Sequence, residues 1–253
     1  LYDPDRTKAP LEGGQERTWE EFGAWLEEKR GSFGNGSGVG LLVPDSKSPT
    51  FKVLVDSFKQ AYPQARIFSD DATRPAARHE GFALVGAEGH AVLYDLAKAD
   101  VVLALDSDLL GSEPDGVYHA RHFASRRRLE NDATGMNRLY AVEPAFSITG
   151  ATADNRLQIP ASQVGEFLKS VAGKVGQATD DSALAALSGT SPGERFDAWV
   201  DAVAEDLLAH QGTSVLAVGP RQPSWVHALA LAVNDALENT GSTVLLRRDV
   251  VVD

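Results

Sequence analysis

The chain has 253 residues, of which 43% are hydrophobic and 24% are charged, the ordinary balance of a globular protein with one large domain or two small ones. Lysine and arginine number 24 against 36 aspartates and glutamates, and the net charge of −12 argues against a nucleic-acid duplex held through its phosphates. Cysteine is absent, which excludes disulfides, thiolate catalysis and cysteine-held iron–sulfur clusters within these residues. No apolar run approaches the roughly 18 residues of a membrane-spanning helix, so we expect no direct membrane span.

The ends of the sequence suggest that it belongs to a longer polypeptide. It begins at Leu1 rather than methionine and stops just after the apolar residues 250–252. We therefore expect that a signal peptide would lie outside these residues.

The first helix is predicted by a capping box. Thr18 and Glu21 have the spacing at which each side chain bonds the other residue's backbone N–H, so a helix should begin there and run to about Arg30. Its apolar side chains share one face: Phe22, Trp25 and Leu26. The glycine-rich residues 31–38 that follow precede a strand, whereas a phosphate-binding loop follows one, which favours a surface loop.

Strands and helices alternate along the rest of the chain. Strands are predicted at residues 39–43, 65–68, 101–105, 139–142, 214–218 and 243–246. Helices are predicted after Ser48 and Ser162, over about 117–128, from a second capping box at 191–194, and over 225–237. Such alternation predicts an α/β fold with two Rossmann-like lobes and mainly parallel sheets.

The small, polar residues 173–189 are expected to connect these two lobes. Because a new βαβ run follows them, residues 1–68 and 191–253 should share one discontinuous lobe. Residues 69–190 should form the inserted lobe.

Two aspartates end the most apolar strand. Asp106 and Asp108 would lie at the sheet edge where open α/β folds bind ligands, so a divalent metal or a ligand amine is conceivable. Two carboxylates are few for a metal site, and a polar turn is the alternative interpretation.

Positive charge gathers on the helix predicted over residues 117–128. Arg121, Arg126, Arg127 and Arg128 contrast with the acidic chain and suggest a docking patch, the alternative being a solvated face that pairs with acidic neighbours. His119 and His122 are one turn apart, as metal ligands can be, but no third ligand is evident.

A further loop could hold an anion. Residues 219–224 join a strand to a helix whose first amides are free, and Arg221 would add positive charge. Ser224 is also an ordinary helix N-cap, and His227 on the helix is more often a structural histidine than a ligand.

Three blocks of sequence together resemble a known family. They are DVVLALDSDLLG at 100–111 with the arginines at 126–128, NRLYAVEP at 137–144 continuing to TGATADNRL at 149–157, and VGPRQP at 218–223 with His227 and Asn234. These blocks are similar to the molybdopterin oxidoreductase-like region of the large iron–sulfur subunit of alternative complex III, a quinol-oxidising membrane complex in a twin-arginine-translocated molybdopterin oxidoreductase family. The resemblance covers most of the chain.

The resemblance implies that no molybdenum cofactor is held. Relatives that bind the pterin cofactor have an Asp-Pro-Arg-like turn and a Pro-Gly-Thr-Asp-like turn, whereas this chain has Glu143-Pro144-Ala145 and Pro160-Ala161-Ser162-Gln163. Residues 74–80, where the family's metal ligand would fall, contain no cysteine. The positions left as vestigial cofactor-binding candidates are Asp106, Asp108, Glu143, Thr149, Asp154, Gly219, Arg221, Gln222 and His227. Iron–sulfur clusters are expected elsewhere in the parent chain.

The function implied by the resemblance is a cofactor-free module with a structural and docking role in a respiratory quinol-oxidising electron-transfer subunit. Catalysis is not expected in these residues, and the partners would be other subunits of a membrane-bound respiratory complex on the periplasmic face of the bacterial inner membrane. Two alternatives stay open: a part of a molybdopterin-dependent oxidoreductase that still binds a pterin guanine nucleotide, or an unrelated small-ligand-binding α/β module.

Overall fold

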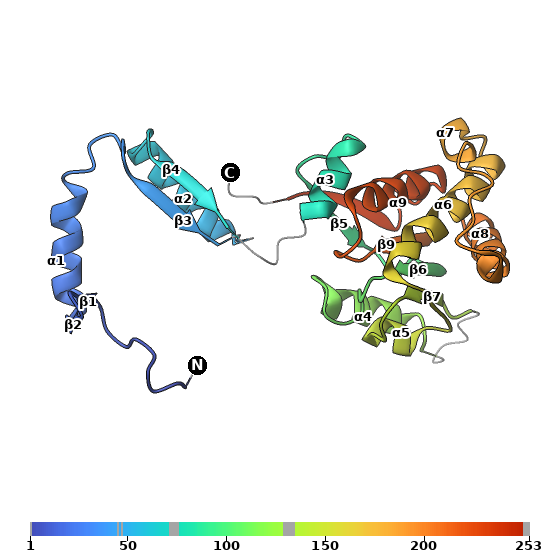
Figure 1. Cartoon of the computed structure of the whole chain (residues 1–253), viewed down its shortest axis with the longest axis horizontal. Coiled ribbons are helices and arrows are strands. Elements are labelled where there is room, and N and C mark those ends of the chain that lie inside the picture. Colours follow the sequence, from blue (N-terminus) through green and yellow to red (C-terminus); the bar gives the residue numbers. More distant parts are fainter. Residues whose placement is uncertain (1, 45, 47, 71–75, 129–134, 250–253) are drawn as a thin grey trace. The chain divides into compact units, whose positions relative to one another are not determined.

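The computed structural model describes residues 2–44, 46, 48–70, 76–128 and 135–249 (Figure 1). The chain divides into two compact units, unit 1 up to Arg74 and unit 2 from Pro75 to Asp249. None of the helices in the described ranges is long and apolar enough to cross a membrane. The predicted apolar run at 250–252 and the first part of the 74–80 segment lie outside the described residues.

Unit 1 contains a small hairpin, two helices and a parallel strand pair. Its elements are β1 (Leu11–Glu12), β2 (Gln15–Glu16), α1 (Trp19–Arg30), β3 (Gly40–Val43), α2 (Pro49–Ala61) and β4 (Arg66–Ser69). The predicted capping box is confirmed, because the Thr18 side chain accepts from the Glu21 N–H and the Glu21 side chain accepts from the Thr18 N–H. Strands β3 and β4 pair in parallel, and α2 connects them along the chain. These three elements are the predicted βαβ unit.

Unit 2 is built on a four-stranded parallel sheet in the order β8-β7-β6-β9. The strands are β6 (Val101–Leu105), β7 (Arg138–Glu143), β8 (Asn155–Gln158) and β9 (Ser214–Val218). A separate antiparallel pair joins β5 (His90–Tyr94) to β10 (Val244–Arg248). The parallel sheet confirms the predicted α/β fold class.

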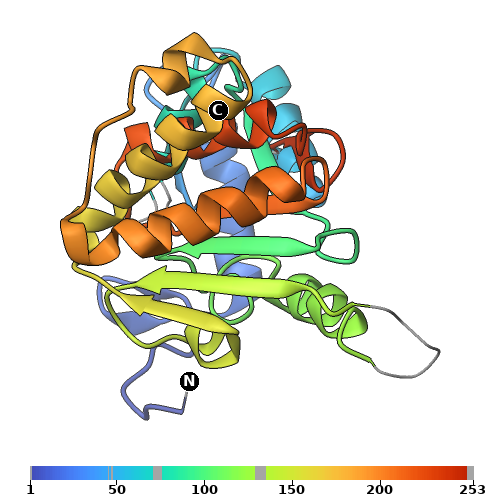
Figure 2. The same cartoon turned by 90° about the vertical axis from the view of Figure 1, so that its right-hand side faces the viewer.

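Helices cover both faces of this sheet (Figure 2). They are α3 (Ala76–Leu84), α4 (Gly116–Ser125), α5 (Ile148–Thr152), α6 (Ala161–Ala178), α7 (Ser182–Ala185), α8 (Asp197–Ala209), α9 (Ser224–Ala236) and a 3₁₀ turn at Glu194–Phe196. Side chains alternate along β6, so that Leu103 packs with residues of α6 and α8 while Val102 packs with residues of α3 and α4. Both faces of the strand are therefore buried, as its unbroken apolar sequence predicts.

The division of the chain into units differs from the expected two-lobe arrangement. Strand β9 is hydrogen-bonded to β6, so residues 191–249 belong to the same compact unit as residues 76–190 rather than to a lobe shared with residues 1–68. Sequence patterns locate a strand but do not tell which strand is its neighbour, because every parallel pairing uses the same backbone groups.

The expected connector at 173–189 is also wrong, because α6 continues through it to Ala178. Its small residues serve close packing: a Cβ on Gly176 would lie 2.3 Å from the backbone nitrogen of Ala185, at the contact with α7. The second capping box does not form either. The Ser191 hydroxyl accepts from the Gly193 N–H and donates to Asp197, and a 3₁₀ turn begins at Glu194.

Candidate functional site

The candidate site lies at the carboxyl edge of the four-stranded sheet. Asp106 and Asp108 follow β6, Glu143 ends β7 and Arg221 follows β9, and all four line one cavity of about 330 Å³. Parallel strands bring their carboxyl ends to the same edge, which is why residues more than a hundred positions apart meet here. The structure therefore brings these four predicted residues together.

Asp106 contacts two side chains of the loop that follows β9. Its carboxylate accepts a hydrogen bond from the Gln222 side chain at 3.0 Å and pairs with the Arg221 guanidinium. The backbone of Asp106 has φ 50°, a left-handed conformation that is uncommon outside glycine. Gly219 is required opposite it, because a Cβ there would lie 1.7 Å from the Asp106 carbonyl oxygen.

Asp108 binds two loops through its carboxylate. It accepts from the backbone N–H and hydroxyl of Thr149 at 2.9 and 3.0 Å, and from the backbone N–H and hydroxyl of Ser112, both at 2.9 Å. Burial raises the pKa of Asp108, but these four hydrogen bonds outweigh it and hold that pKa below its usual range. The carboxylate is therefore a structural anion that fixes both loops.

Glu113 and Glu143 also bind polar groups of the chain. Glu113 accepts from the Asp108 N–H at 2.8 Å and pairs with Arg78 at 3.2 Å. Its pKa is raised by burial, against the opposing effect of Arg78. Glu143 accepts from the Ser147 hydroxyl at 2.5 Å and from Arg156 at 2.6 Å.

Two other predicted residues lie away from the cavity. Asp154 precedes β8 at the opposite edge of the sheet, where it accepts from the Leu139 N–H at 2.8 Å and pairs with Arg127. His227 is buried in α9, and burial together with the nearby Arg78 lowers its pKa to about 4. A buried neutral imidazole of this kind matches the structural interpretation of His227.

The arginines predicted as a docking patch divide into two groups. Arg126 pairs with Asp100, while Arg127 pairs with Asp154, bonds Asn137 and lies 4.4 Å from the centre of the Phe123 ring. Arg121 and Arg128 are exposed. Two of the four charges therefore have partners within the chain, which is the alternative interpretation of this helix.

The histidines beside the arginines form part of the packing. His119 is buried, and its Nε2 accepts from the Tyr94 N–H at 3.4 Å. Among the described residues, no group of three or more histidines, aspartates or glutamates is arranged to hold a metal ion.

Several residues of the site were missed by the sequence analysis: Arg78, Ser112, Glu113, Ser147 and Arg156. Glu113 follows Asp108 by five residues and could have been included as part of the same turn. Arg78 comes from α3 and Arg156 from β8, so no local pattern links them to the strand ends they contact.

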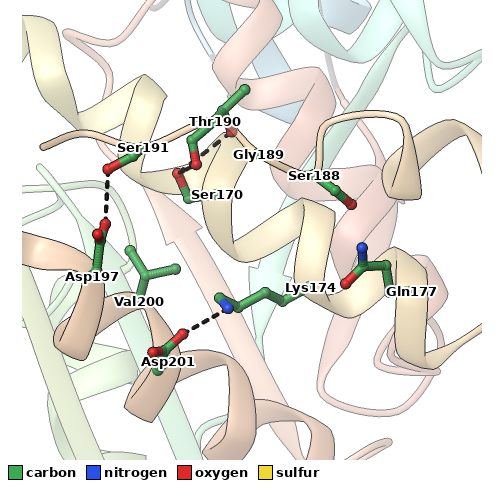
Figure 3. Close-up of a pocket in the computed structure, with 10 residues that line it drawn as sticks. All are labelled: Ser170, Lys174, Gln177, Ser188, Gly189, Thr190, Ser191, Asp197, Val200 and Asp201. Atoms are coloured by element: carbon green, nitrogen blue, oxygen red, sulfur yellow. Dashed lines mark hydrogen bonds and ion pairs between the residues drawn. The ribbon is translucent and has the colours of Figure 1, made fainter. Parts of the chain in front are cut away.

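A second cavity, of about 390 Å³, lies between α6, α8 and the loop before the 3₁₀ turn (Figure 3). Its polar side chains bond mostly one another. Lys174 pairs with Asp201 at 2.6 Å, and Ser170 donates to the Thr190 carbonyl at 2.8 Å. These pairs tie the helices and the loop together and leave few donors to converge on a ligand.

No protein-family model matches the chain, and no curated protein matches it in sequence. Solved structures do match its fold. Acetylene hydratase from Pelobacter acetylenicus superposes with a TM-score of 0.61 at 11% identity, covering 92% of this chain and 34% of the hydratase. The formyltransferase/hydrolase complex from Methylorubrum extorquens, in complex with methylofuran, gives a TM-score of 0.52 at 16% identity, covering 87% of this chain and 55% of the matched one.

The chain therefore has a mixed α/β fold with a parallel sheet that is similar to the fold of the matched part of acetylene hydratase. At these identities the likeness extends to the fold alone. The chain spans about a third of the hydratase and about half of the second protein, so the activities of those whole proteins do not transfer to it.

Proposed function

We propose that this chain is a cofactor-free molybdopterin oxidoreductase-like module with a structural and docking role in a respiratory quinol-oxidising electron-transfer subunit. The observation that carries the proposal is that backbone N–H groups at the carboxyl edge of the sheet already have hydrogen-bond partners. The N–H groups of Asp108, Ser112 and Thr149 donate to the chain's own carboxylates. These are the kind of groups that would otherwise receive the phosphates of a pterin nucleotide.

The residues present do not fit a pterin guanine nucleotide. Four carboxylates lie at this edge, Asp106, Asp108, Glu113 and Glu143. Three of them already engage arginines of the chain, so a nucleotide diphosphate placed here would find those cations occupied and would meet the like charge of Asp108. At about 4 Å, two like charges repel by about 4 kcal/mol at the effective dielectric constant typical near a protein surface. Arg221, which lines the cavity, already pairs with Asp106.

The respiratory context of the proposal rests on the sequence resemblance. We place the module at the periplasmic face of the inner membrane, with other subunits of the complex as partners and iron–sulfur clusters elsewhere in the parent chain. The fold supports the oxidoreductase-like part of this assignment. Arg121 and Arg128 are the exposed cations left for docking on α4 and just after it.

Guanosine diphosphate is the probe that tests the site, because it has the base and the pyrophosphate of the pterin nucleotide. Calorimetric titration of the chain should show no saturable binding in the millimolar range or below. In the parent protein, elemental analysis should find iron without molybdenum or tungsten.

Binding of guanosine diphosphate with a Kd below about 100 µM would overturn the proposal, provided that Arg221→Ala abolishes it and the matched variant Lys174→Ala in the second cavity does not. That result would establish the alternative of a retained pterin nucleotide site, for which the exposed Arg221 side chain at the cavity is the favouring feature.

A further inference from the structure

The strongest feature that the proposed site does not use is the helix α1 in unit 1. It is twelve residues long and none of its residues is buried. Its apolar side chains nevertheless form a continuous stripe, with fractional exposures of 68% for Trp19, 39% for Phe22, 47% for Trp25 and 41% for Leu26. Their spacing places them along one face of the helix.

The stripe is internally ordered. The Phe22 ring lies 5.9 Å from that of Trp19 and 6.0 Å from that of Trp25, measured between ring centres. Phe22 and Trp25 also line a groove of about 730 Å³ that residues of α1 and of the β1–β2 hairpin form. Large aromatic side chains that stay exposed together on one face are typical of a surface that binds another protein.

The charges around this groove indicate what kind of partner fits. Residues 11–28 contain six glutamates and a single arginine, Arg17. Glu12, Glu21 and Glu28 line the groove, and Arg17 is already paired with Glu12 at 2.9 Å and with Glu21 at 3.7 Å. The lining of the groove therefore combines apolar side chains with a net negative charge, because it has three glutamates and one arginine.

We infer that the α1 groove binds an amphipathic helix of a partner subunit, with apolar side chains facing Phe22 and Trp25 and basic side chains facing the glutamates. Apolar burial supplies affinity and the opposite charges fix the orientation. A second copy of this chain fits less well because its net charge is −12. An anionic lipid surface is repelled by the same glutamates. This inference deepens the docking role proposed above and rests on it.

The test uses two synthetic peptides of about four helical turns. One has leucines along one face and lysines elsewhere, and the other has glutamates in place of the lysines. Calorimetry on the whole chain should show saturable binding of the lysine peptide, with the glutamate peptide bound at least about tenfold more weakly because the net negative charge of the groove repels it.

The variant Phe22→Asp separates groove binding from general attraction to an acidic protein. It adds a negative charge, which would strengthen a purely electrostatic attraction, but it places that charge where an apolar side chain lines the groove. It should therefore reduce the affinity for the lysine peptide at least about tenfold. Val117→Asp is the matched control, since Val117 is an exposed apolar residue of α4 that receives the same added charge. It should leave the affinity unchanged.

Both variants should keep the far-ultraviolet circular dichroism and melting temperature of the wild type, because neither side chain is buried. Equal affinity for the two peptides, or no loss in Phe22→Asp, would overturn the inference. So would a dimer of the chain that Phe22→Asp dissociates, or binding to vesicles containing phosphatidylserine. Guanosine diphosphate binding would refute the cofactor-free module without touching this result, so the two failures are distinguishable.

Discussion

The two units of this chain use similar sequences to very different effect. In unit 2, all five residues of the apolar strand β6 are buried, whereas in unit 1 only Val43 of the four residues in β3 is buried. Leu42 of β3 and Phe68 of β4 remain largely exposed. The difference lies in the layers: β6 has helices on both of its faces and strands on both of its sides, while β3 pairs only with β4 in the part of the chain that the structure describes. An apolar run thus specifies a strand, and the surrounding layers decide how much of it is buried.

The largest effect should come from matched phenylalanine truncations. Phe167 in α6 is fully buried, so Phe167→Ala should reduce the free energy of unfolding by about 3–5 kcal/mol through lost burial and a cavity. Phe22→Ala in α1 should change it by no more than about 0.5 kcal/mol, because that ring is exposed. Chemical denaturation measures both. Equal losses in the two variants would contradict the difference drawn between the units.

The difference between a local apolar pattern and the layers that surround a strand also explains how much of the fold the sequence predicts. Strands at 101–105 and 214–218 were predicted with the bounds that the structure has, because a run of four or five apolar residues between turn signals is typical of a buried strand. Strands β5 and β8 were missed: β8 contains a single apolar residue, and the apolar residues of β5 lie in a stretch, 70–97, that has few other periodic signals. The neighbours of each strand, and hence the domain division, depend on tertiary packing that no local pattern records.

The sequence predicts the residues of the candidate site at strand ends but not their partners from other elements. Asp106, Asp108, Glu143 and Arg221 could be expected together because each follows a parallel strand. Asp154 was misplaced because it precedes its strand rather than following it, which puts it at the opposite edge. The partners that neutralise the site, Arg78 and Arg156, come from elements whose position only the packing determines.

Acidification should affect unit 2 through its histidines. All six histidines lie between residues 79 and 227, within unit 2. The pKa of His227 falls from 6.5 to about 4 on folding, so below pH 6.5 the unfolded chain binds a proton that the folded chain does not. Stability should therefore fall as the pH falls from 6.5 toward 4, by about 3 kcal/mol in total from this group.

The lowered pKa of His119 acts in the same direction, and the raised pKa of Glu113 acts in the opposite one. The variant His227→Gln isolates the contribution of His227, since the other groups are common to both proteins. Urea denaturation at intervals of pH should show that the variant loses less stability than the wild type over this range. Parallel pH profiles would mean that His227 is accessible to protons in the folded state.

A smaller effect distinguishes the structural arginines from the exposed ones. Arg127→Ala removes an ion pair with Asp154, a hydrogen bond to Asn137 and a stacked contact with Phe123, and should cost about 1–2 kcal/mol. Arg128→Ala is the matched neighbour and should cost no more than about 0.5 kcal/mol, because its side chain is exposed. Thermal unfolding of the two variants measures the difference. A larger loss in Arg128→Ala would reverse the assignment of structural and docking charges.

The smallest effect should be a gain, confined to unit 1. Gly23 lies inside α1, and a Cβ added there meets no atom within 4 Å, so Gly23→Ala should stabilise the helix by about 0.5–1 kcal/mol through reduced backbone entropy. Hydrogen exchange should then show about two- to fivefold stronger protection of the α1 amides. Because no residue of α1 is buried, amides of β6 and β7 should exchange as in the wild type. Stronger protection in β6 and β7 as well would show that α1 and the four-stranded sheet unfold as one cooperative unit, which would remove the contrast between the two regions.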